Sequence, residues 1–468
     1  MPKRLRPLSG LDAGFLYLEA AGTPMHVGSM MVLAPPRRTR RPFVEILRDH
    51  VGARLDRAPA LRRVLQPGPL DLTHPLWLDL DTIDLKDHIV ERRLAGTGTR
   101  TALHALVARL HAQPLSREKP MWQFTVIEGL STGEVVLYTK VHHALLDGQG
   151  GMALAQALLD PTPQLVVSQK TQRNTGAAPP RAREVANVAL RATVAQFSKL
   201  VRGLPATLKL AGAAIAAPAA IAGGLKSLVL SAPRTPFNVR VGEQRRFATL
   251  SVPLDDVKRA AKQLEVSLND LVLAAVSGAL REHLIKRDAL PKKSLVAAMP
   301  VSLRAVGNAD VDNQVSMVQC ALATQIEDTH ERLRAIAADT RVLKARVGAM
   351  KHLIPTDFPG LAAPLWAGGL SRFWGSGRVA ERLPVLANLA ISNVPGPPIP
   401  LYLAGAKLLE TYPVSIVTHG LGLNITLQSY AGRLEFGVIA DAVALPNAQA
   451  LARGIERAMA DLIDLAPV

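Results

Sequence analysis

The sequence predicts an α/β fold in which mixed sheets are covered by helices and the chain forms two lobes. Short stretches rich in β-branched and aromatic residues alternate with longer amphipathic segments, the pattern of strands and helices. The strands 123–127 and 134–141 are joined through the turn Ser131-Thr132-Gly133, which indicates a hairpin and therefore a sheet that is not purely parallel. A polar and then Ala-rich segment divides the chain near its middle.

The composition is that of a globular protein. The chain has 468 residues, of which 48% are hydrophobic and 20% charged, so it can bury a large core and is not a disordered chain. Its single cysteine, Cys320, lies in an apolar stretch that we expect to form a buried strand, 313–322. One cysteine excludes an intrachain disulfide framework and a cysteine-rich zinc site.

The net charge of +17 predicts attraction to polyanions, which include nucleic acids, anionic lipid surfaces and phosphorylated cofactors. Aromatic residues make up only 4% of the chain and no zinc finger or RNA-binding signature is visible, so we expect no nucleic-acid partner. The basic N-terminus lacks the apolar core of a signal peptide. The longest apolar run, between Lys209 and Lys226, is short and contains Pro218, so we expect a cytoplasmic protein without a transmembrane helix.

The first lobe is predicted to span residues 1–170. Pro35-Pro36 ends its first strand, and the helix that follows carries Phe43, Ile46, Leu47 and Val51 on one side. The predicted elements, in order, are strand 29–33, helix 41–55, strand 75–80, helix 101–112, the two hairpin strands and helix 149–159.

Residues 171–242 are predicted to form a connector. Residues 171–180 are polar and flexible in composition, and residues 181–230 are Ala-rich and helical, with their basic residues opposed by a single acid, Glu184. A basic amphipathic segment of this kind can lie on an anionic membrane surface. A solvated helix pair that joins the two lobes fits equally well, and the two interpretations do not exclude each other.

The second lobe is predicted to span residues 243–468. Ser267 is a suitable N-cap for a helix that reaches about residue 285, with Asp270 in the position of a capping box. Strand 385–393 is followed by Pro395, where pairing should stop and the chain should cross to a new position. Further predicted elements are strands 246–252 and 294–304, helix 329–347, strands 422–430 and 433–440 joined by the tight turn Ala431-Gly432, and a helix from Pro446 to about residue 463.

The most informative stretch lies between strand 134–141 and helix 149–159, where His142 and His143 are followed by Asp147 and Gly148. Histidine can take and return a proton near neutral pH, and strand ends often carry the reacting side chains of α/β proteins. A histidine pair at a strand end can also be structural. The two histidines and Asp147 could hold a metal, but no further His or Cys ligand follows at a suitable spacing.

The chain resembles the bacterial wax ester synthase/acyl-CoA:diacylglycerol acyltransferases, within the HHxxxDG superfamily of CoA-dependent acyltransferases. The resemblance spans nearly the whole chain and rests on the order of several short motifs. These are Leu8-Ser9-Gly10-Leu11-Asp12, Pro24-Met25-His26-Val27-Gly28, His142 to Gly148, Ser267-Leu268-Asn269-Asp270, Pro300-Val301-Ser302-Leu303-Arg304 and Ser392-Asn393-Val394-Pro395-Gly396-Pro397. Pro120-Met121-Trp122 departs from the family's Pro-Leu-Trp, with little expected effect because Leu and Met are similar in volume.

The resemblance implies two chloramphenicol-acyltransferase-like lobes, each a mixed sheet with helices, with an active-site tunnel between them. It implies transfer of a long-chain acyl group from acyl-CoA, the donor substrate, to diacylglycerol or a fatty alcohol. No permanently bound cofactor and no metal are expected. Because both acceptors are apolar lipids, we expect peripheral contact with the inner membrane or with lipid inclusions.

The resemblance also implies roles for individual residues. His143 would be the general base and His142 a supporting residue. Asn269 would donate to the oxyanion, although a place in the first turn of the helix that Ser267 caps accounts for it equally well.

Other residues of the motifs would support the site. By the resemblance, Asp147 would point away from the substrate and hold the loop through a pair with Arg304, next to Gly148, which permits a backbone shape that a Cβ would forbid. Asn393 and Gly396 would shape the crossing between the lobes.

Two rival functions remain open at this stage. One is an acyltransferase of the same superfamily that acts on another hydroxyl or on an amine. The other is a non-catalytic protein that binds a lipid surface, in which replacing His143 would leave function intact.

Overall fold

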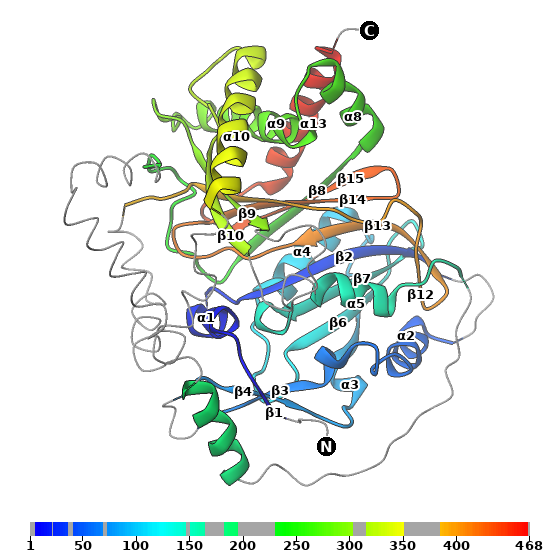
Figure 1. The fold of residues 1–468 in the computed structure, drawn as a ribbon. Coiled ribbons are helices and arrows are strands. Elements are labelled where there is room, and N and C mark those ends of the chain that lie inside the picture. The colour runs from blue at the N-terminus through cyan, green and yellow to red at the C-terminus, as the bar shows by residue number, and fades with distance from the viewer. Residues whose placement is uncertain are drawn as a thin grey trace.

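The computed structural model shows two lobes, each built on a six-stranded mixed sheet (Figure 1). It describes residues 5–20, 22–35, 41–68, 73–146, 150–163, 182–194, 230–302, 315–350 and 384–466. Helices from the C-terminal half cover one end of the molecule, and the N-terminal elements form the other. The predicted α/β class with two lobes is confirmed.

The sheet of the N-terminal lobe has the strand order β12-β13-β2-β7-β6-β5. Among the described strands of this sheet, only β5 and β6 pair in parallel, and the predicted hairpin is the antiparallel pair β6 and β7. The strand bounds are β2 His26–Ala34, β5 Ile89–Arg93, β6 Trp122–Glu128, β7 Val135–His142, β12 Tyr402–Leu403 and β13 Ala406–Val414.

Helices pack on this sheet, and a three-stranded sheet lies at the lower end of the molecule in Figure 1. The helix predicted at 41–55 runs from Phe43 to Gly52 as α2 and buries the four apolar residues that were expected on one side, together with Val44. The other helices are α1 Gly10–Leu18, α3 Leu85–His88, α4 Arg100–Ala112 and α5 Gly150–Leu158, with 3-10 turns η1 Pro59–Arg62 and η3 His143–Leu145. The small sheet contains β1 Leu5–Pro7, β3 Arg63–Gln66 and β4 Leu76–Asp79.

The sheet of the C-terminal lobe has the strand order β10-β9-β11-β14-β15-β8, with β11 parallel to both of its neighbours. Its strands are β8 Arg245–Pro253, β9 Val296–Ser302, β10 Val315–Ala321, β11 Leu389–Val394, β14 Leu423–Tyr430 and β15 Arg433–Asp441. The helices that cover it in Figure 1 are α8 Leu254–Gln263, α9 Leu268–Ile285, α10 Thr329–Met350 and α13 Ala448–Asp464.

The helix cap, the tight turn and the buried cysteine that the sequence predicts for the C-terminal lobe are all present in the structure. Ser267 and Asp270 form a complete capping box at the start of α9, with the two reciprocal backbone-to-side-chain hydrogen bonds at 3.3 and 2.9 Å. Ala431 and Gly432 turn between β14 and β15 with φ values of 43° and 82°. Cys320 is buried on β10, and burial raises the pKa of its thiol to about 12.

The predicted crossing after the proline-rich segment is confirmed. β11 ends at Val394 in the C-terminal sheet, and the chain then enters the other lobe, where β13 pairs with β2 from Lys407↔Ala34 to Val414↔Gly28. The division into 1–170, 171–242 and 243–468 stays a prediction. The structure adds that the third range contributes two strands to the sheet of the first.

Most of the predicted connector lies outside the described residues. Residues 182–194 are helical, and Val185 and Ala189 pack against Leu76 of β4. Within the part of the chain that the structure describes, no helix is long and apolar enough to cross a membrane.

Candidate active site

The two histidines lie at the end of a strand, as the sequence predicts. β7 ends at His142, and the short turn η3 carries His143. Main-chain hydrogen bonds hold both residues: the N–H of His142 donates to Met121 O at 2.9 Å, and the N–H of His143 donates to Met25 O at 2.8 Å. The backbone of the pair is therefore fixed from two sides.

The imidazole of His143 stacks on the ring of Phe15, with centroids 3.9 Å apart and planes 22° from parallel. Burial lowers the pKa of His143 to about 4, and the neighbouring His142 contributes to the shift. At neutral pH the ring is therefore uncharged. A neutral imidazole can accept a proton from a substrate hydroxyl.

The ring of His142 is fully buried and contacts protein groups at both nitrogens. Nδ1 accepts a hydrogen bond from the N–H of Ala144 at 3.1 Å and so caps the turn that carries His143. Nε2 lies 3.3 Å from Oε1 of Glu19. Because Nδ1 accepts this hydrogen bond, a ring proton belongs on Nε2, which faces the carboxylate.

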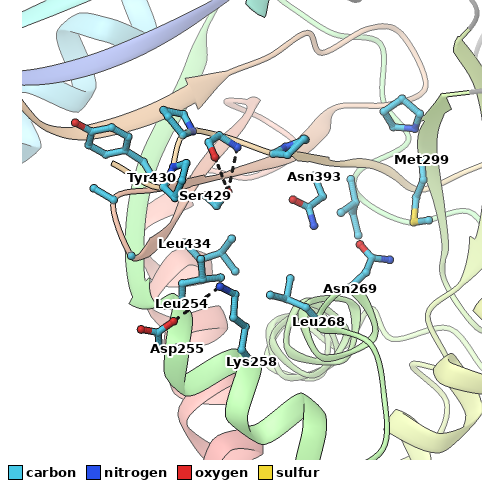
Figure 2. A pocket seen from close by; sticks show the side chains of 18 of the residues that line it. Leu254, Asp255, Lys258, Leu268, Asn269, Met299, Asn393, Ser429, Tyr430 and Leu434 are labelled. Carbon is cyan, nitrogen blue, oxygen red and sulfur yellow. Dashed lines mark hydrogen bonds and ion pairs between the residues drawn. The ribbon is translucent and has the colours of Figure 1, made fainter. Parts of the chain in front are cut away.

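Three other predicted residues meet at one cavity in the C-terminal lobe. Asn269, Asn393 and Gly396 all line a cavity of about 1020 Å³. Asn269 stands on the first turn of α9, and Figure 2 shows its side chain facing the same space as that of Asn393 from β11. Among the described residues that line this cavity, His143 does not appear.

The cavity has a mixed lining of apolar and polar residues, with two lysines at its exposed side. Lys258 of α8 and Lys344 of α10 line it, and Lys258 lies 3.8 Å from Asp255, an exposed pair (Figure 2). The apolar part of the lining includes Leu254, Leu268, Met299, Leu343, Ile391 and Leu434. Such a cavity fits a ligand with an apolar chain and an anionic group.

Gly396 is required by a close approach of two chain segments. A Cβ at this position would lie 2.0 Å from the carbonyl oxygen of Ser429. The N–H of Gly396 also donates to Oγ of Ser429 at 3.0 Å. The segment after β11 is thereby held against β14 at the cavity wall.

Asp147, Gly148 and Arg304 lie outside the described residues, so the predicted pair between Asp147 and Arg304 stays a prediction. Where the structure describes the chain, no group of three or more His, Cys, Asp or Glu residues has the arrangement of a metal site.

Sequence reasoning missed Phe15 and Glu19, which contact the two histidines, and the two lysines of the cavity. Phe15 and Glu19 are four residues apart, the spacing at which helical residues share a face, although α1 ends at Leu18 and Glu19 is its C-cap. That spacing was the available signal, but it does not say which distant segment the face contacts.

Comparisons with known proteins agree along the whole chain. A family model described as the wax ester synthase/diacylglycerol acyltransferase catalytic domain matches residues 8–272, and one described as the C-terminal domain of the same family matches residues 311–463. A probable diacylglycerol O-acyltransferase of Mycobacterium tuberculosis is 35% identical over 459 residues, covering 96% of this chain and 97% of the relative. A putative diacylglycerol O-acyltransferase of the same organism is 36% identical over 461 residues, covering 97% and 99%.

Solved structures show the same relationship. The wax ester synthase/diacylglycerol acyltransferase from Marinobacter aquaeolei aligns with a TM-score of 0.71 at 29% identity, covering 99% of this chain and all of that one (100%). The starter condensation domain of rhizomide synthetase aligns with a TM-score of 0.53 at 12% identity over 99% of this chain and 95% of that one. At that identity the second match supports only the fold.

Proposed function

The chain belongs to the wax ester synthase/diacylglycerol acyltransferase family, and we propose that His143 is the general base of its reaction. The protein is an acyl-CoA-dependent O-acyltransferase whose acceptor is diacylglycerol or a long-chain fatty alcohol. The observation that carries the proposal for His143 is the position of its half-buried imidazole at the end of β7, where desolvation lowers its pKa to about 4.

The reaction is acyl transfer from a thioester to a hydroxyl. His143 removes the proton of the acceptor hydroxyl as its oxygen attacks the carbonyl carbon of acyl-CoA, and a tetrahedral oxyanion forms. Collapse of this intermediate breaks the carbon–sulfur bond, and the protonated imidazole neutralises the departing thiolate. The products are the ester and CoA, and no covalent bond to the protein is needed. The low pKa of His143 favours release of the proton in the second step.

The oxyanion needs a hydrogen-bond donor that is in place before the reaction. We assign this role to the side-chain amide of Asn269, which faces the cavity from the first turn of α9. Asn393 faces the same space and is the alternative donor. Replacing each with alanine separates the two, since loss of an oxyanion donor lowers kcat by about a hundredfold to a thousandfold.

The acyl donor carries phosphates, and the cavity carries Lys258 and Lys344. We propose that these two lysines contact the phosphates of CoA. The double replacement by alanine is then expected to raise the KM for palmitoyl-CoA while kcat changes little, because the contact is the same in the ground state and the transition state.

The deciding experiment measures thiol release from palmitoyl-CoA with and without hexadecanol or diacylglycerol, for the wild type and His143→Ala. Release that requires an acceptor and disappears in the variant supports the proposal, and the better acceptor identifies the main activity. Acceptor-dependent release that survives in a folded His143→Ala protein would remove His143 from the mechanism. No release with either lipid would redirect the search to other acceptors or to a binding role.

We also propose peripheral contact with the inner membrane or with lipid inclusions. The net charge of +17 attracts anionic lipid, and the helical residues 182–194 expose Leu190 and Val194. Co-sedimentation with vesicles that contain anionic lipid, and its loss at high salt, is the expected result. Binding to neutral vesicles alone would contradict the electrostatic part of the proposal.

A further inference from the structure

The helix α1 is held in place by features that the chain's first motif encodes. Ser9 caps the helix: its Oγ accepts from the N–H of Asp12 at 3.1 Å and donates to the carboxylate of Asp12 at 2.7 Å. Ala13 and Leu16 are buried in the core of the N-terminal lobe. The helix packs against the turn η3, so its position determines what contacts the two histidines.

Phe15 and Glu19 project from this helix toward the histidine pair. Phe15 lies within the helix, and Glu19 is its C-cap residue, where the backbone has become extended. Phe15 stacks on the ring of His143, and Glu19 lies against Nε2 of His142. One helix end therefore contacts both rings.

The carboxylate of Glu19 also holds the backbone on which His143 depends. Its Oε1 accepts from the N–H of Met25 at 3.1 Å, and the carbonyl of Met25 accepts from the N–H of His143 at 2.8 Å. Through Oε1 the same carboxylate faces His142, whose Nδ1 caps the turn of His143. Two series of contacts, one through Met25 and one through His142, therefore connect Glu19 to His143.

Arg117 completes the arrangement. Its guanidinium donates to Oε2 of Glu19 through Nε at 3.2 Å and Nη2 at 2.8 Å, and to the carbonyl of Leu16 in α1 at 2.7 Å. The side chain of Glu19 is only 7% exposed. Burial alone would raise the pKa of this carboxyl, but its contacts with His142, Arg117 and the Met25 amide outweigh burial and hold the pKa at about 2. Glu19 is therefore charged throughout the neutral range.

We propose that Phe15 and Glu19 are positioning residues for His143. Phe15 fixes the plane of its imidazole, and Glu19 holds the ring of His142 and the backbone of Met25, which together fix the turn. The inference rests on the proposed role of His143 as the base. Neither residue contacts substrate in this scheme, so the expected defect is in turnover and not in donor binding.

The test uses Glu19→Gln, Glu19→Ala and Phe15→Leu, with Glu91→Gln as the matched control because Glu91 is an exposed glutamate of the same lobe. Glutamine keeps the size of Glu19 and one acceptor oxygen, but it places an amide N–H₂ against either Arg117 or His142. Since a misplacement of about 1 Å can cost about a hundredfold, we expect kcat to fall about tenfold in Glu19→Gln and up to about a hundredfold in Glu19→Ala and Phe15→Leu. The KM for palmitoyl-CoA should stay within about twofold of the wild type in all of them.

A readout that does not depend on turnover follows the ring of His142 directly. The ¹⁵N shifts of this ring, assigned by comparison with His142→Gln, should report an unprotonated Nδ1 in the wild type, and the Nε2 shift should move in Glu19→Ala because Nε2 loses the carboxylate that it faces. Glu91→Gln should leave both kcat and the ring shifts unchanged. If Glu19→Ala does not fold, Glu19→Gln and Phe15→Leu decide the question.

The inference is overturned if the folded Glu19 and Phe15 variants retain wild-type kcat, or if kcat falls only in proportion to the folded fraction. It is also overturned if the ring shifts of His142 do not change. Failure of the proposed function looks different: the wild type then shows no acceptor-dependent thiol release, or His143→Ala keeps it, while the ring shifts still report whether Glu19 orients His142.

Discussion

Replacing Glu435 with glutamine is expected to stabilise the protein at alkaline pH and to leave its stability almost unchanged in acid. Glu435 lies on β15 opposite Ser251 of β8 and is fully buried. Burial raises the pKa of its carboxyl to about 7. The contact with Ser251 is the next largest contribution and lowers the pKa, and the nearby Glu410 raises it further. The ionised side chain is thus an unfavourable feature of the folded state.

The size of the effect follows from the two pKa values. The pKa is 4.5 in an unfolded chain and about 7 in the folded protein. A difference of about 2.5 units corresponds to about 3 kcal/mol. Because the folded-state pKa of this acid is raised, the folded state binds the proton more tightly. The favourable contribution is complete below pH 4.5 and is lost as the pH rises through about 7. Glutamine imitates the protonated form at every pH.

The assay is urea unfolding of the wild type and of Glu435→Gln at pH 5 and pH 8.5. The gain in free energy of unfolding from the substitution should be about 1 to 3 kcal/mol larger at pH 8.5 than at pH 5. Other titrating groups contribute equally to both proteins and cancel in this difference. Glu91→Gln, at an exposed site, should show no such pH dependence. Equal gains at both pH values, or a loss at pH 8.5, would refute the reasoning.

Three further outcomes are expected. The value of kcat/KM should not change with pH down to about pH 5 and should fall as the pH drops through about 4, because the lowered pKa keeps His143 neutral. A loss of activity centred near pH 6.5, in protein shown to be folded by circular dichroism, would contradict this prediction. Gly396→Ala should lower the free energy of unfolding by about 1 to 3 kcal/mol and raise the KM for palmitoyl-CoA. Gly151→Ala is the control, because a Cβ there meets nothing within 4 Å, and it should change neither value in thermal unfolding and rate assays. Arg54→Ala should cost about 3 to 5 kcal/mol, since it leaves the part-buried Asp160 without its bidentate partner; a loss below about 1 kcal/mol in thermal unfolding would show that water replaces the guanidinium.

The sequence predicted best those elements whose signal is local. The helix expected at 101–112 is α4, Arg100–Ala112, and the strand expected at 134–141 is β7, Val135–His142. Their apolar periodicity and flanking turn residues lie within the segment itself, so no knowledge of distant neighbours is needed.

β13 shows why other elements were missed. Its sequence contains Pro413, which cannot donate to a ladder and lowers the expectation of a strand. The strand exists because β2 supplies its hydrogen-bonding partner from the other lobe. That partnership is a property of the topology, which a local pattern does not contain.

The sequence likewise predicted the part of the candidate site that depends on local pattern and missed the part that depends on distant contacts. His143 could be located because the end of a strand and the start of a helix are both visible in the sequence around it. Its contacts with Phe15 and the link from Glu19 to Arg117 join segments that lie about a hundred or more residues apart, so they became visible only in the fold.

The insertion of β13 beside β2 has a consequence for biosynthesis. The hydroxyls of Ser29 and Thr411 lie 2.8 Å apart although 382 positions separate them in the chain. A ribosome that emits roughly 5 to 20 residues each second therefore exposes the apolar edge of β2 for roughly tens of seconds before its neighbour emerges. An unpaired apolar strand edge is a template for aggregation. A fragment that stops before residue 406 would leave this edge of β2 unpaired permanently. The N-terminal lobe alone should therefore need β13, supplied as a peptide or by fusion, to avoid aggregation.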